Sequence, residues 1–71
     1  MSLFTERLQA LQESTALKKE VCSAIGISIM AYYRYEKGER EPSMSTLIAL
    51  ADFFGVSLDY LVGRSDDPNL H

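Results

Sequence analysis

Residues 17–40 read LKKEVCSAIGISIMAYYRYEKGER, and this stretch decides the fold. Apolar residues recur at helical spacing as far as Ile25, and a second stretch with the same period begins at Ile29. Only the tripeptide Gly-Ile-Ser at 26–28 separates the two predicted helices. Because this break is too short for an ordinary return hairpin, the second helix must cross the first steeply. A steep crossing with glycine in the turn predicts a helix-turn-helix unit.

Helical spacing predicts three further helices, and no stretch shows the alternating pattern of a β-strand. With 71 residues the chain makes one domain, and we expect an all-α, five-helix fold over residues 1–63. The polar stretch 64–71 is expected to be a flexible tail. The predicted helices cover residues 3–13, 16–25 and 29–37, the stretch between a serine cap (Ser43 or Ser45) and Gly55, and a short segment capped by Ser57 that ends at Gly63.

One face of each helix is expected to form the core. Tyr32, Tyr35 and Glu36 share the face of the third helix that points toward the first, and Glu36 is expected to be structural. Ser14 and Thr15 are expected to supply the N-cap of the second helix. The other expected inward residues are Phe4, Leu8, Leu11, Leu17, Val21, Ala24, Ile25, Leu47, Leu50, Ala51 and Phe54.

Charge is distributed unevenly along the chain. The net charge is −3, yet residues 18–40 hold five Lys and Arg against three Glu, a balance of +2. Such a molecule can present one positive face to phosphates while it stays acidic overall. No apolar run approaches the ~18 residues of a membrane span, and the N-terminus lacks the apolar stretch of a signal peptide. We therefore expect a cytoplasmic protein with no membrane partner.

Catalytic and metal-binding sites are not expected. Cys22 is the only cysteine, His71 is the only histidine, and their wide separation makes no ligand set. The acidic residues are spread out, and nothing forms a nucleophile–base pair. Cys22 is expected to be inert packing. We therefore expect no enzyme activity, no metal, no cofactor and no small-molecule ligand.

Four stretches resemble a known family of regulators. They are FTERL at 4–8, VC at 21–22 with IGIS at 25–28, YRYEKGEREPS at 33–43 and TLIALADFFGVSLDYLVG at 46–63. Over about residues 4–63 the chain resembles the XRE family, the lambda-repressor-like or Cro-type helix-turn-helix regulators. The resemblance implies a compact five-helix domain that binds double-stranded operator DNA, usually as a twofold dimer.

The chain departs from the family pattern at both helices of the predicted unit. In most members a Thr or Ser caps the second helix and a Gln follows it as a DNA contact, but counting back along this helix places Leu17 and Lys18 there. Counting forward from Phe4, the chain is one residue short before this helix. The start of the third helix, often polar in the family, is here Ile29 and Met30.

The third helix is expected to enter the DNA major groove. Arginine can bond O6 and N7 of guanine, and an apolar side chain can pack on a thymine methyl group. By resemblance Ile29, Met30 and Arg34 hold base-reading positions, and Lys18, Lys37 and Arg40 match positions that meet the DNA backbone. Ser28 at the positive end of the helix and the phenol of Tyr33 can also approach phosphates.

These residues have alternative roles. Arg34 can instead pair with Glu20 or another surface acid, and the lysines can form a merely solvated face. Ile29 and Met30 can instead be buried against a partner protein.

A second surface is expected to join two copies of the chain. Two half-sites about 34 Å apart require a self-complementary patch. The apolar residues near the C-terminus exceed what one short helix can bury, and the expected homodimer interface is Phe53, Leu58, Tyr60, Leu61 and Val62. Alternatively, Phe54, Leu58 and Leu61 close the small core, and Phe53 with Tyr60 covers it.

The leading hypothesis is a sequence-specific DNA-binding transcriptional regulator, a repressor of phage or mobile-element type. The alternative is a protein-interaction module that kept the fold, such as an antitoxin or anti-repressor partner.

Overall fold

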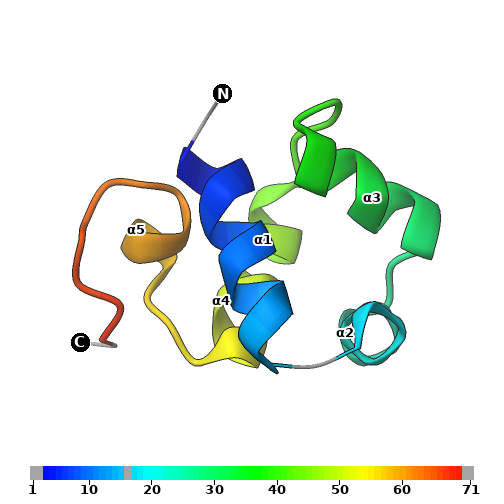
Figure 1. Cartoon of the computed structure of the whole chain (residues 1–71), viewed down its shortest axis with the longest axis horizontal. Coiled ribbons are helices and arrows are strands. Elements are labelled where there is room, and N and C mark those ends of the chain that lie inside the picture. Colours follow the sequence, from blue (N-terminus) through cyan, green and yellow to red (C-terminus); the bar gives the residue numbers. More distant parts are fainter. Residues whose placement is uncertain (1–2, 16, 70–71) are drawn as a thin grey trace.

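Five helices make up the part of the chain that the structure describes, residues 3–15 and 17–69 of this computed structural model (Figure 1). They confirm the expected all-α fold. Figure 1 shows α1 and α4 in the middle of the molecule, with α5 on one side and α2 and α3 on the other. The helices are α1 (Leu3–Thr15), α2 (Lys18–Ile25), α3 (Ile29–Lys37), α4 (Met44–Phe54) and α5 (Leu58–Leu61).

The centre of the core takes one fully buried side chain from every helix. In chain order these are Leu8, Val21, Tyr32, Leu50 and Leu61, each with a relative exposure of 0%. Fully burying a large apolar side chain contributes about 1.5–3 kcal/mol. Because all five helices contribute buried side chains to one core cluster, no pair of helices holds this core without the others.

Local chemistry sets the helix ends as the sequence predicted. Ser28, Ser43 and Ser57 cap α3, α4 and α5, and each hydroxyl oxygen accepts a hydrogen bond from the backbone N–H three residues later. Gly26 ends α2 at φ 77°, a left-handed conformation that glycine adopts without a Cβ clash. Ser43, rather than Ser45, is the cap of α4.

The predicted cap of α2 was wrong. Helix α1 continues to Thr15, and the Ser14 hydroxyl donates to the carbonyls of Ala10 and Leu11 in its own helix. Leu17 occupies the N-cap position of α2 and makes no side-chain cap hydrogen bond. Its side chain is 68% exposed, so the prediction that it points inward was also wrong.

Helix α2 buries a narrower face than the sequence predicted. Val21 and Cys22 are buried and Ile25 is half-buried, whereas Ala24 is exposed and corrects its inward assignment. An eight-residue helix makes about two turns, so only one strip of its surface can face the core. None of the helices in residues 3–15 and 17–69 is long and apolar enough to cross a membrane.

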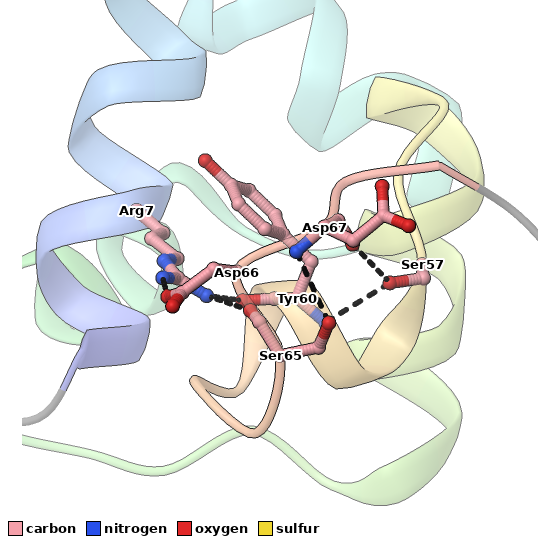
Figure 2. Close-up of polar contacts among 6 residues, drawn as sticks. All are labelled: Arg7, Ser57, Tyr60, Ser65, Asp66 and Asp67. Atoms are coloured by element: carbon pink, nitrogen blue, oxygen red, sulfur yellow. Dashed lines mark hydrogen bonds and ion pairs between the residues drawn. The ribbon is translucent and has the colours of Figure 1, made fainter.

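The segment after α5 folds back onto the domain (Figure 2). The Arg7 guanidinium of α1 donates to the carbonyls of Tyr60 and Ser65, at 2.6 Å each, and to the Asp66 carboxylate at 3.0 Å. It also lies 4.1 Å from the centre of the Tyr60 ring. The Ser57 N–H donates to the Pro68 carbonyl at 2.9 Å. These contacts place Ser65, Asp66 and Pro68 of the predicted tail against the domain, while residues 70–71 lie outside the described part.

Candidate nucleic-acid interface

Helices α2 and α3 form the helix-turn-helix. Residues 26–28 alone separate them, and Figure 1 shows α2 end-on while α3 lies along the plane of the picture, so their axes cross steeply. The Ser28 hydroxyl accepts from the Ala31 N–H at 3.1 Å and starts α3. At the other end, the Gly38 N–H donates to the carbonyls of Arg34 and Tyr35. Helix α3 therefore runs for nine residues between two capped ends.

The inner face of α3 is the predicted one. Tyr32, Tyr35 and Glu36 are all buried. The Tyr32 hydroxyl donates to Gln12 Oε1 at 2.6 Å, and Gln9 Nε2 donates to the backbone carbonyl of Glu36 at 2.6 Å. Hydrogen bonds with two side chains of α1 therefore fix the position and angle of α3 relative to α1. Neither glutamine was singled out from the sequence, because their partners lie 20 and 27 residues away.

The buried Tyr32 phenol gives folding a pH dependence. Burial raises the pKa of Tyr32, and the Glu36 and Cys22 charges act in the same direction. Since the raised pKa belongs to the folded state, its stabilisation is complete below the unfolded value of about 10 and is lost as pH rises above it. The pKa values of Cys22, raised by burial, and Lys18, raised by its bond to Glu36, act with the same sign.

We expect Tyr32→Phe to weaken, without abolishing, the loss of stability in alkali. At neutral pH it loses the bond to Gln12 and about 0.5–1.5 kcal/mol of unfolding free energy. Urea unfolding between pH 7 and about pH 11 measures both effects. Tyr33→Phe is the control, since that ring is exposed and should keep the wild-type alkaline slope. Equal alkaline slopes for wild type and Tyr32→Phe would contradict this assignment.

The outer face of α3 is exposed. It carries Ile29, Met30, Tyr33, Arg34 and Lys37, the residues expected there. Two turns of helix thus present apolar side chains at the N-terminal end and cations at the C-terminal end. Ser28 lies at the start of this face and Arg40 just beyond its end, both exposed.

Most of the cations that form no salt bridge lie on α3 or just after it. Of the seven Lys and Arg, Arg7, Lys18 and Arg64 pair with acids. The alternative pair of Arg34 with Glu20 does not form in the described part of the chain. The four cations without a salt bridge to any described residue are Lys19, Arg34, Lys37 and Arg40, and all are exposed.

Lys18, which was predicted to contact the DNA backbone, forms an ion pair within the protein. Its ammonium lies 3.0 Å from the Glu36 carboxylate, in a shallow cleft where α1, α2 and α3 meet. The neighbouring Lys19 is exposed and was left out of the predicted contact set. The short segment before α2 left the register of the two lysines open, and only their positions on the folded helix separate them.

The expected dimer surface is only partly available. Leu61 is fully buried in the monomer, so its assignment to an interface was wrong. Phe53 packs edge-to-face on Phe54, with ring centres 5.2 Å apart, and the Tyr60 ring lies under Arg7. Phe53, Leu58, Tyr60 and Val62 are all half-buried. Two large apolar side chains of α4, Met44 and Ile48, are more exposed than this half-buried group.

Comparisons with known proteins agree with this geometry. A family model described as Helix-turn-helix matches residues 15–61. An HTH-type transcriptional regulator of Bacillus subtilis, YobD, is 34% identical over 68 residues, which are 94% of this chain and 61% of that protein. The cryptic phage CTXphi transcriptional repressor RstR of Vibrio cholerae is 34% identical over 65 residues, 90% of this chain and 59% of that protein. The chain thus spans about three fifths of the length of these relatives.

Among solved structures, the P22 c2 repressor protein in complex with a synthetic operator superposes with a TM-score of 0.80. The two are 27% identical, and the match covers 87% of this chain and 96% of the other. The family model spans the helix-turn-helix, α4 and α5. This chain belongs to the XRE-type helix-turn-helix family.

Proposed function

We propose that this protein is a sequence-specific regulator that binds double-stranded operator DNA and acts as a repressor of phage or mobile-element type. One observation carries the proposal: three of the four cations without salt bridges, Arg34, Lys37 and Arg40, lie on the exposed face of α3 or just beyond its end. Two relatives support it, since one is a phage transcriptional repressor and the other is a repressor held with an operator.

The geometry suggests how each residue acts. The exposed face of α3 enters the major groove, where the Arg34 fork bonds a guanine and Ile29 or Met30 packs on a thymine methyl group. Lys37 and Arg40 follow at the end of the helix and meet phosphates, which set the register without reading sequence. Ser28 and Tyr33 approach phosphates from the start and side of α3.

Two copies are proposed to act together. Half-sites about 34 Å apart would each receive one α3 of a twofold dimer. The proposed interface is the half-buried group Phe53, Leu58, Tyr60 and Val62, without Leu61. Because such a regulator works where the operator is, we place it in the cytoplasm. Sedimentation of the protein alone and on operator DNA measures the assembly, and selection of bound duplexes from a random pool gives the half-site spacing.

A salt titration tests the DNA assignment. Each phosphate neutralised lowers the slope of log affinity against log salt concentration by about 0.9 on duplex DNA. Four available cations predict a steep fall in binding to random duplex between low and moderate salt. A flat response, or no binding at low salt, would reject the DNA function. The alternative of a protein-interaction module would then be favoured.

We expect Arg34→Ala to weaken operator binding by about 1–3 kcal/mol and to relax preference at one base pair. The control is Arg64→Ala, because Arg64 is an exposed arginine that pairs with Asp59 far from α3. Binding isotherms on the operator and on single-base variants measure both effects. Equal losses on every sequence would reassign Arg34 to the DNA backbone.

A further inference from the structure

Lys18 bridges the two helices of the helix-turn-helix. It begins α2, and its ammonium reaches α3 in two places: 3.0 Å from the Glu36 carboxylate and 4.6 Å from the centre of the Tyr33 ring. Glu36 and Tyr33 are three residues apart on α3, so their side chains are neighbours across the boundary between its buried and exposed faces. The single cation thus touches the buried face of α3 through Glu36 and its exposed face through Tyr33.

In this position the charge of Lys18 is paired with that of Glu36. The Glu36 side chain is only 9% exposed, whereas that of Lys18 is 36% exposed. Moving the ammonium to a phosphate would leave the Glu36 carboxylate buried without its counter-charge, which is strongly unfavourable. The bond to Glu36 also raises the pKa of Lys18 and keeps it charged.

Tyr33 is the exposed end of this arrangement. Its ring is 39% exposed on the outer face of α3, among the side chains proposed to meet DNA. An ammonium over the ring face restricts the orientations of the ring. A side chain that is ordered before binding loses less conformational freedom when it binds.

We propose that Lys18 is a positioning residue, which orients Tyr33 for its DNA contact and braces α3 against α2, and that it does not contact phosphate. This inference rests on the proposed DNA function and refines it. It moves one cation out of the set that neutralises the DNA backbone and leaves Lys19, Arg34, Lys37 and Arg40 there. It also makes Tyr33 the contact that depends on Lys18.

The first test compares salt dependence. The double variant Lys18→Met/Glu36→Gln removes the ion pair as a neutral unit, so it should lower operator affinity while leaving the slope against salt unchanged. Lys37→Met is the matched control and should reduce the slope by about 1, as loss of one phosphate contact does. A slope change in the double variant equal to that of Lys37→Met overturns the inference.

The second test is a double-mutant cycle on operator affinity. Lys18→Met should weaken binding about threefold to tenfold, the range expected for ordering one side chain. Tyr33→Leu should then cost less affinity in the Lys18→Met background than in wild type. The control cycle pairs Tyr33→Leu with Lys19→Met, whose effects should add. Additive effects of Lys18→Met and Tyr33→Leu would overturn the inference.

Folding and function are kept separate in these tests. Lys18→Arg keeps the charge beside Glu36 and should retain wild-type affinity, while circular dichroism shows that each variant is folded at the temperature used. Loss of affinity in Lys18→Arg together with an unchanged fold overturns the inference. Wild-type protein without salt-dependent binding would overturn the proposed function itself, a result distinct from any difference between variants.

Discussion

Leu50→Ala is expected to lower the unfolding free energy by about 2–5 kcal/mol. Leu50 is fully buried on α4 and belongs to a core cluster that also takes buried side chains from the other four helices. Replacing leucine by alanine removes buried apolar surface and leaves a cavity, which the surrounding helices can fill only in part. A domain of this length has only about 4–10 kcal/mol of stability, from about 0.05–0.15 kcal/mol per residue. This loss is a large share of the total, so the melting temperature of the variant should fall by about 10 °C or more.

The matched control is Ile48→Ala, two residues earlier on the same helix. Ile48 is 45% exposed, so the same kind of truncation should cost well under half as much. Urea unfolding followed by circular dichroism measures both free energies. If the two variants lost equal stability, Leu50 would not lie at the centre of the core.

Gly63→Ala is the second large effect, with an expected loss of about 2–4 kcal/mol. Gly63 has φ 88°, a conformation strained for any residue with a Cβ. A Cβ built there would also lie 2.7 Å from the Leu3 Cβ, so the start of α1 or the end of α5 must move. Both consequences arise because the chain turns beside the first residue of α1.

Gly55→Ala separates the two causes. Gly55 has a similar φ of 68°, but nothing lies within 4 Å of a Cβ at that position. It should cost only the backbone strain of about 1–2 kcal/mol. Thermal or urea unfolding of both variants gives the difference, which measures the contact with Leu3. Equal losses would show that this contact is easily relieved.

Local chemistry made much of the fold predictable. Ser28, Ser43 and Ser57 cap helices because a hydroxyl satisfies backbone N–H groups within three residues, whatever the rest of the chain does. The inner face of α3 follows from helical geometry alone, since Tyr32, Tyr35 and Glu36 must share one side. The exposed face opposite, with Arg34, was predictable for the same reason.

The errors came from contacts between distant residues. Leu17 looked like an inward residue because its spacing matched Val21, but α1 ran on to Thr15 and left it outside. Leu61 was assigned to a dimer interface because the C-terminal apolar residues exceed what one short helix can bury, but the folded domain buries Leu61 completely.

The sequence by itself determined that there are five helices, where most of them end and which side of α3 faces outward. These features depend on hydrogen bonds and side-chain periods that span a few residues. Only the tertiary structure decided the partners of Lys18 and Arg7, which lie 18 and up to 59 residues away along the chain. A long flexible cation has several acids within reach, and the packing angles of the helices select one. That selection places Lys18 against Glu36 and leaves Lys19, Arg34, Lys37 and Arg40 without a salt bridge to any described residue.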